Sequence, residues 1–381
     1  MRSVQVAGRS VFYISMMKKA LILTVGYGQG HRSAAEGIAQ EFSLRGISAR
    51  VEDPCEADTS GLYSLTKAYY KLCVRRAPWL WAMAYSQTDT ADWSTKVSSF
   101  GIRTATERVE ELLVSWRPDI VVCTYPLFAY MVDYLCERRG KRVPCSVVVT
   151  DSLEISKPWL KSKAELLFVP DEYSREALLR RYGLDASSIY ASGFPVRRQF
   201  LKTENKSAPS KLGFKIVYGA YLSIRTTVQQ IARLSELFPF AEITLLAGDR
   251  YEELNKRLRC FQISGKLVVL RSSERMDSLL NEAHLYIGKA GAATIFECYA
   301  AAVPVIVNYA LPGQEQGNLE LLLRDEVGIW AGETGELCAA VSLLMRDAAS
   351  GWRQMRNKML ALRERVTGAH VIVNVIESYL N

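Results

Sequence analysis

The chain has 381 residues, of which 49% are hydrophobic and 23% are charged, a composition typical of a globular protein with a large buried core. Its formal net charge of +8 fits nucleic acid, anionic lipid or anionic small-molecule partners and does not choose among them. No segment approaches the ~18 to 20 consecutive apolar residues of a membrane span, so we expect a protein that can lie on a membrane but does not cross one.

The cysteines and the N-terminus point to neither a zinc site nor a signal peptide. None of the eight cysteines forms a CxxC pair, and only three histidines are present, which disfavours a zinc site and indicates reduced thiols in a cytosolic compartment. The basic N-terminal segment superficially resembles a signal peptide. However, the apolar run at 20–25 is too short for one and ends in a Gly-rich turn, so it is predicted to be a buried first strand.

In the first half, short apolar runs alternate with helical patterns, as in parallel α/β folds. The predicted strands are 20–25, 120–124, 146–150, 166–169 and 189–191. The predicted helices lie around 33–45, 61–76, 104–116, 128–138 and 174–182. A polar stretch at 202–210 then has linker composition and no periodicity.

The same alternation restarts after this linker. The predicted strands are 215–218, 242–246, 266–270, 285–287 and 305–307. The predicted helices lie near 226–237, 251–260, 276–282, 293–301 and 318–325. An apolar, helix-like segment at 371–379 is long enough to pack back across the other half. Two α/β halves joined by a short linker are therefore expected.

The first strand runs into a Gly-rich turn, Gly26-Tyr-Gly-Gln-Gly-His31. Its spacing matches neither the GxGxxG dinucleotide motif nor a P-loop, and no acidic residue follows a clear second strand. His31 places an imidazole at the carboxyl end of a strand, where open α/β sheets bind ligands. A structural histidine and a base or substrate contact are equally compatible with this position.

A second strand–turn–helix spans 286–297. Its small residues permit a close approach, and Thr294 with the helix N-terminus offers hydrogen bonds to phosphate oxygens. Glu297, one turn into this helix, suits vicinal sugar hydroxyls, as acidic residues do in dinucleotide folds, or merely favours the positive helix end. The loop at 312–318 offers Gln314 and Glu315, a donor and an acceptor for sugar hydroxyls.

Basic and aromatic residues cluster at 67–85. Lys67 and Lys71 flank two tyrosines, and Trp79 and Trp81 follow. Such a mixture is found in interfacial membrane segments and also in partly buried aromatic helices, and the residues alone favour the second.

Taken in chain order, these segments resemble glycosyltransferase family 28, in the branch of monogalactosyldiacylglycerol synthases and processive diacylglycerol glucosyltransferases. The resemblance runs from Lys18 to the C-terminus. The matching motifs lie at 28–31, 34–35, 117–121, 124–126, 150–151 with Trp159, 192–197 with Phe200, 289–297 and 312–318. The last two are the most specific, since together they resemble the donor-site signature of the family.

The resemblance implies an α/β GT-B fold, with two Rossmann-like parallel-sheet domains facing a central cleft. It implies an acceptor domain at 18–200, a linker at 201–212, a UDP-sugar domain at 213–367 and a C-terminal helix at 368–381 that packs back on the first domain. The implied reaction inverts the anomeric centre and moves galactose or glucose from UDP-galactose or UDP-glucose to diacylglycerol, with no cofactor and no essential metal. The implied location is the cytoplasm, peripheral on an anionic inner membrane face, and no nucleic acid is expected as a partner.

The resemblance also implies residue roles. His31 is the base or an acceptor contact, and Asp151 is a supporting carboxylate. On the donor side, Glu297 holds the ribose. The other implied UDP-sugar contacts are Gly219, Met276 near the uracil, Ala292, Ala293 and Thr294 at the phosphates, Gln314 and Glu315 at the sugar, and Asn318. The implied acceptor or membrane contacts are Gly28, Gly30, Tyr125, Trp159, Lys67, Lys71, Trp79 and Trp81.

Several positions depart from the family pattern. The loop 219–225 lacks a second glycine, Ala292 or Ala293 replaces another, and no histidine lies between Asp151 and Trp159. Two alternatives therefore stand beside the main interpretation. One is N-acetylglucosaminyl transfer to a lipid-linked cell-wall precursor, for which a TGGH-type first loop is expected. The other is a non-catalytic protein that binds a sugar nucleotide or a lipid.

Overall fold

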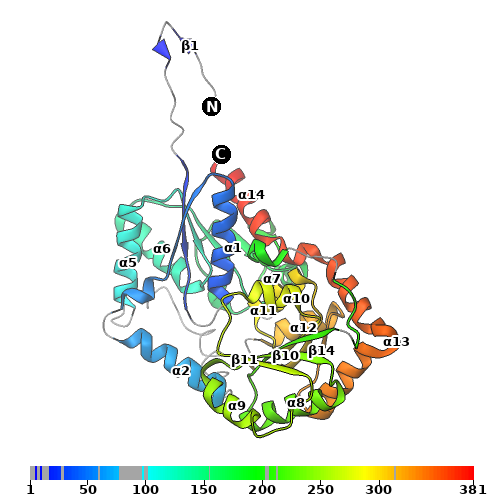
Figure 1. Ribbon diagram of the computed structural model, residues 1–381. Helices are drawn as coiled ribbons and strands as arrows, with labels where there is room; N and C mark the ends of the chain where they lie inside the picture. The colour runs from blue at the N-terminus through cyan, green and yellow to red at the C-terminus, as the bar shows by residue number, and fades with distance from the viewer. Residues whose placement is uncertain are drawn as a thin grey trace.

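The computed structural model describes residues 5–6, 9–10, 17–26, 30–58, 61–76, 97, 102–153, 155–201, 206–211, 213–312 and 315–381. These residues form two six-stranded parallel sheets, each flanked by helices, and a short antiparallel pair of β1 (Gln5–Val6) with β2 (Arg9–Ser10). Figure 1 shows the sheets in two separate halves of the molecule. The predicted fold class, two Rossmann-like parallel-sheet domains, is confirmed.

The first half is built on a sheet of order β4-β3-β5-β6-β7-β8. Its strands are β3 (Lys19–Leu23), β4 (Ser48–Glu52), β5 (Ile120–Cys123), β6 (Cys145–Val148), β7 (Leu166–Val169) and β8 (Ile189–Ala191). Its helices are α1 (Gly30–Leu44), α2 (Leu62–Arg76), α5 (Arg103–Ser115), α6 (Pro126–Arg139) and α7 (Glu172–Tyr182). The chain reverses direction across the sheet between β3 and β5. Ligands of such sheets bind at the carboxyl ends of the strands at this switch point.

The second half has the sheet order β11-β10-β9-β12-β13-β14. Its strands are β9 (Phe214–Gly219), β10 (Ala241–Leu246), β11 (Lys266–Leu270), β12 (Leu285–Lys289), β13 (Val305–Tyr309) and β14 (Gly328–Trp330). Its helices are α8 (Ile224–Leu237), α9 (Tyr251–Leu258), α10 (Met276–Glu282), α11 (Ala292–Ala301), α12 (Gln316–Arg324) and α13 (Thr334–Ala361). Here the switch point lies between β9 and β12, so the loops after these two strands form the expected ligand edge.

Besides the short pair β1 and β2, two strands of the six-stranded sheets and one long helix were missing from the sequence prediction: β4, β14 and α13. Both strands lie at sheet edges, and β4 is half-buried along its whole length, so neither has the apolar run that marks a central strand. In α13, residues 346–349 have non-helical backbone angles, and this kink interrupts the helical period of the sequence.

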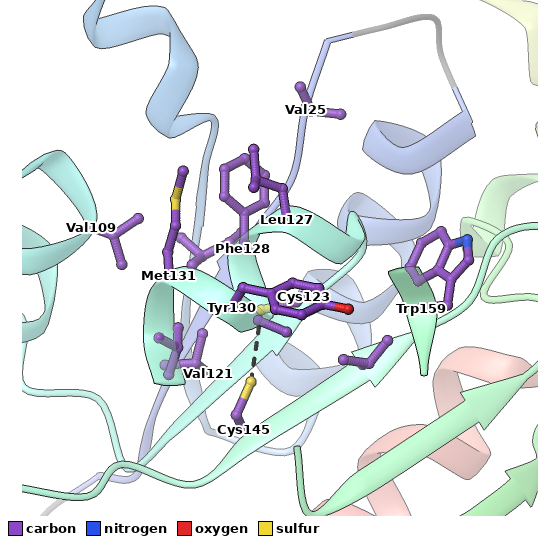
Figure 2. Close-up of a cluster of buried hydrophobic side chains, with 14 of the residues drawn as sticks. Val25, Val109, Val121, Cys123, Leu127, Phe128, Tyr130, Met131, Cys145 and Trp159 are labelled. Atoms are coloured by element: carbon purple, nitrogen blue, oxygen red, sulfur yellow. Dashed lines mark hydrogen bonds between the residues drawn. The ribbon is translucent and has the colours of Figure 1, made fainter. Parts of the chain in front are cut away.

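Figure 2 shows the apolar core of the first half between the sheet and α6. Cys123 and Cys145 lie on neighbouring strands with their sulfurs 3.8 Å apart, and every described cysteine is a free thiol. Tyr130 donates its hydroxyl proton to the Pro158 carbonyl at 2.8 Å. This bond fastens the short 3₁₀ turn Lys157–Trp159 and so positions the buried indole of Trp159 on the core.

The chain passes between the halves twice, at 193–196 and again at 364–368. Phe194 N–H donates to the Arg365 carbonyl at 2.8 Å, and Phe194 stacks on Phe296 of α11 with ring centroids 4.6 Å apart. Gly193 has a φ of +84°, and a Cβ there would lie 2.2 Å from the Glu364 carbonyl oxygen. Only glycine permits this crossing, because any side chain would separate the two segments.

The last helix, α14 (Gly368–Leu380), lies beside α1 of the first half (Figure 1). Ile372, Val373 and Ile376 pack into the core beneath β3. Arg45, directly after α1, pairs with Glu377 of α14 at 2.6 Å. The chain therefore ends on the half in which it began.

Candidate active site

His31 lies at the switch point of the first sheet, in the first turn of α1 and 8% exposed. Its Nδ1 is 2.8 Å from the Thr124 carbonyl oxygen and 3.0 Å from Thr150 Oγ1. A carbonyl only accepts, so Nδ1 carries the proton and Nε2 keeps its lone pair. Burial lowers the pKa of His31 to about 4, although the bond to Thr124 opposes this shift. The imidazole is therefore neutral at pH 7, with Nε2 able to accept a proton.

Asp151 follows β6 and is 7% exposed. The indole N–H of Trp159 donates to its Oδ2 at 3.1 Å. Burial raises the pKa of Asp151 to about 6, the Trp159 bond opposes the rise, and the negative charge of Glu315 in the other half adds to it. A carboxyl with this pKa changes charge close to neutral pH.

These groups form one cluster. The His31 ring centroid lies 5.2 Å from that of Tyr125 and 6.2 Å from that of Trp159, which also holds Asp151. The structure thus brings together four of the predicted residues, from the ends of three different strands and the turn that follows β6. Gly30 begins α1 beside them, whereas Gly28 lies outside the described residues.

On the donor side, Lys289 ends β12 and Gly291 precedes α11. The Lys289 ammonium pairs with the Glu315 carboxylate and lies 5.5 Å from the ring centroid of Tyr221, in the loop after β9. A Cβ at Gly219 would lie 2.7 Å from the Tyr221 ring. The loops after β9 and β12 are therefore in contact, as the position of the switch point requires.

Glu297 is 5% exposed and lies at the junction of the two halves. Its Oε1 accepts from Ser33 Oγ of α1 at 3.1 Å and from Arg197 at 3.2 Å. Burial raises the pKa of Glu297, while Arg197 and Ser33 lower it. Arg197 also pairs with Glu36 at 3.2 Å. The predicted ribose contact is thus held in place by Ser33 and Arg197. Arg197 belongs to the motif at 192–197, but sequence reasoning gave it no role.

Most of the remaining predicted donor residues lie on α10, α11 and α12 of the second half. Ala292, Ala293 and Thr294 form the first turn of α11, and Met276 begins α10. The Asn318 amide donates to the Ala290 carbonyl at 3.1 Å and so fixes the turn before α11. Gln314 lies outside the described residues.

Lys67 lies on the inward side of α2. Its ammonium is 4.1 Å from the Tyr63 ring centroid, and a Cβ at Gly26 would lie 2.8 Å from it. Asp53 follows the unpredicted strand β4 and accepts from Gly26 N–H at 2.9 Å and from the Tyr63 hydroxyl at 2.6 Å. The expectation that no acidic residue follows a second strand was therefore wrong; Asp53 instead ties the first loop to α2.

The opposite side of α2 is apolar and faces outward. Leu62, Leu65, Tyr69 and Leu72 are 38%, 67%, 49% and 52% exposed. Their spacing places them on one helical face, which we call the α2 stripe. The Lys71 side chain and residues Trp79 and Trp81 lie outside what the structure describes.

Tyr70 of α2 lies close to charged residues of the second half. Burial raises the pKa of its phenol, Lys289 opposes this rise, and Glu315 and Asp151 add to it. Figure 1 shows α2 extending from the first half toward the second. The helix thus reaches both Asp151 of the first half and the pair of Lys289 with Glu315 in the second.

Among the residues that the structure describes, no group of three or more His, Cys, Asp or Glu side chains is placed to hold a metal ion. None of the described helices is both long enough and apolar enough to span a bilayer.

The two halves, with their switch points directed to one another, define the GT-B class of glycosyltransferases. The fold is similar to that of Acinetobacter baumannii MurG, with a TM-score of 0.61 and 14% identity over 95% of this chain and 99% of that one. It is similar to the calicheamicin glycosyltransferase CalG4, with a TM-score of 0.60 and 14% identity over 96% and 98% of the two chains. A putative UDP-N-acetylglucosamine 2-epimerase of Listeria monocytogenes gives a TM-score of 0.60 and 12% identity over 95% and 96%. At such identities the likeness shows the fold alone.

The chain belongs to glycosyltransferase family 28. Residues 31–196 match the monogalactosyldiacylglycerol (MGDG) synthase family model, and residues 220–318 match the glycosyltransferase family 28 C-terminal domain. A processive diacylglycerol β-glucosyltransferase of Bacillus cereus (strain B4264) is 27% identical over 93% of this chain and 92% of its own length. The enzyme of the same name from Bacillus licheniformis is 25% identical over 94% and 95%. The family resemblance of the sequence is thereby confirmed.

Proposed function

We propose that this enzyme transfers a hexose from a UDP-sugar to the hydroxyl of diacylglycerol, with inversion at the anomeric carbon. The observation that carries the proposal is the meeting of the two switch points. Asp151 of the first half is close enough to Glu315 of the second for their charges to interact. The diacylglycerol acceptor is further supported by the names of the family model and of the full-length relatives.

The residues suit a direct displacement. The acceptor oxygen forms a bond to the anomeric carbon as its proton passes to His31 Nε2. The bond from the anomeric carbon to the diphosphate breaks, and its electron pair leaves with UDP. Asp151 supplies a negative charge near the imidazolium as it forms, and the N-terminus of α11 faces the departing diphosphate.

The function is tested by incubating the protein with diacylglycerol and a panel of UDP-sugars, with mass spectrometry of the lipid product. A hexosyl-diacylglycerol formed from UDP-galactose or UDP-glucose is the expected product. Release of UDP without a glycolipid, or N-acetylhexosamine on a different lipid as the only product, would overturn the proposal.

We assign Glu297 to the ribose of the donor. Loss of charge-assisted hydrogen bonds worth ~1.5 to 3 kcal/mol predicts that Glu297→Ala lowers kcat/KM for the donor about tenfold or more. Glu36→Gln is the matched control, because it removes the other partner of Arg197 and leaves Glu297 in place. Donor kinetics of both variants should be compared at matched thermal stability. Equal effects of the two substitutions would mean that Glu297 only joins the halves.

The α2 stripe is the surface that we assign to the membrane, at the cytosolic face where the lipid acceptor resides. Burying one leucine is worth ~1.5 to 3 kcal/mol, so Leu65→Ser/Leu72→Ser should reduce vesicle binding by at least about tenfold. Leu343→Ser, a leucine 54% exposed on α13, is the control and should bind like the wild type. Sedimentation with vesicles measures both. Binding should also rise with anionic lipid and weaken with salt, because the protein is basic. If the double variant binds as well as the control, another surface meets the membrane.

A further inference from the structure

Lys289 is a partly buried cation at the point where three donor-side loops meet. It is the last residue of β12, and its side chain is 20% exposed. Its ammonium pairs with Glu315 and faces the Tyr221 ring at 5.5 Å. A Cβ at Gly291 would lie 2.8 Å from Nζ. The ammonium therefore lies over the turn that leads into α11.

This position is unfavourable for a purely structural lysine. Burial lowers the pKa of Lys289, but Glu315, Tyr221 and Tyr70 more than offset it, so the pKa is raised and the group stays charged. Enclosing an ion pair seldom adds stability over an apolar pair, because both charges lose their hydration. The pair also lies at the switch point of the sheet, where ligands are bound, and beside the positive N-terminus of α11.

Glu315 and Tyr221 keep the ammonium in place. Glu315 is itself fixed, because its second oxygen, Oε2, accepts from Leu311 N–H at 3.0 Å. The Tyr221 ring lies on the ammonium and belongs to the loop after β9, where a second glycine was expected. The tyrosine thus supplies an aromatic face to a cation where the family pattern suggests only open backbone.

We propose that Lys289 is the cation that neutralises the departing diphosphate, and that Glu315 holds it in position until the UDP-sugar binds. This inference deepens the proposed function and rests on it. When the bond to the anomeric carbon breaks, its electron pair adds negative charge to the diphosphate, and the ammonium faces that charge without giving up a proton. The diphosphate becomes the partner of Lys289, and Glu315 is released to accept hydrogen bonds from the hydroxyls of the donor sugar.

The test is a calorimetric comparison of UDP and uridine binding to the full chain. Wild-type protein should bind UDP more tightly than uridine. Lys289→Met should weaken UDP binding about tenfold or more, because a charge-assisted contact is lost, and should change uridine binding by less than about twofold. Lys289→Arg keeps the charge and should retain most of the preference for UDP. Lys215→Met, which removes an ion-paired lysine from β9 of the same sheet, should bind both ligands like the wild type.

The possible outcomes distinguish a failure of this inference from a failure of the proposed function. If Lys289→Met weakens the binding of UDP and of uridine equally, or changes the binding of neither, Lys289 does not contact the diphosphate and the inference is overturned. If the wild type binds neither ligand, the proposed function fails and the inference with it. A kinetic readout adds a second criterion: in Lys289→Met, kcat should fall more than donor KM rises, since the charge on the leaving group is greatest in the transition state.

Discussion

His31→Ala should lower kcat by about 10² to 10⁴-fold, because an alcohol is a poor nucleophile unless its proton is removed as the new bond forms. In the structure Nδ1 is committed to the Thr124 carbonyl, so Nε2 is the nitrogen left to take that proton. Donor affinity should change little, since the proposed UDP contacts belong to the other half. Steady-state kinetics with diacylglycerol, together with UDP binding, measures both quantities.

The control for His31 is His370→Ala, which removes a histidine 61% exposed on α14. It should leave turnover unchanged. Added imidazole should partly restore turnover to His31→Ala and not to the wild type, a response that a merely structural histidine would not give. Near-normal turnover of His31→Ala with diacylglycerol would show that His31 is not the base, and Asp151 would take that role.

Much of the fold could be predicted because the strands that carry it are apolar and the turns between them are distinct. The strands at 166–169, 189–191 and 266–270 and the helix at 276–282 have the predicted bounds. The edge strand β4 could not be found in this way, because all of its residues are only half-buried and they form no apolar run. Missing it also hid Asp53, whose carboxylate joins the first loop to α2.

In the site as well, some residues could be predicted from the sequence and others could not. The family motifs pointed to His31, Asp151, Tyr125 and Trp159, and strand position pointed to His31 as well. The structure brings the four together because each follows the end of a strand in one sheet and such ends meet. The contact of Ser33 with Glu297 joins residues 264 positions apart and depends on how the halves are oriented. No periodicity or spacing in the sequence carries that orientation. The pairing of Lys289 with Glu315 could not be predicted for a similar reason, since it joins the end of strand β12 to the irregular loop before α12.

The pH dependence of the reaction should report Asp151. With a pKa of about 6, its carboxyl is protonated below that pH, so kcat/KM should fall about tenfold per pH unit on the acid side of pH 6. If only His31 mattered, the fall would begin near pH 4, the pKa of its imidazole. Asp151→Asn should lower kcat by about 10² to 10⁴-fold and move the remaining acid limb toward pH 4, as expected when a carboxylate no longer stabilises a forming imidazolium.

Stability should respond in the opposite direction to activity. The folded state holds the Asp151 proton more tightly than an ordinary carboxyl of pKa 3.8, so stability falls as the pH rises from about 4 to 6. Above pH 6 the buried negative charge costs on the order of 3 kcal/mol. Asp151→Asn removes that cost and keeps an oxygen for the Trp159 N–H, so its Tm at pH 8 should exceed that of the wild type by roughly a few degrees.

Asp133→Asn is the control. Burial also raises the pKa of Asp133, on α6, but the acid limb of kcat/KM should not move in this variant. Two results would contradict the proposal that the ionised Asp151 carboxylate serves catalysis at a cost in folding stability. One is an acid limb near pH 4 in the wild type, and the other is a lower Tm for Asp151→Asn at pH 8.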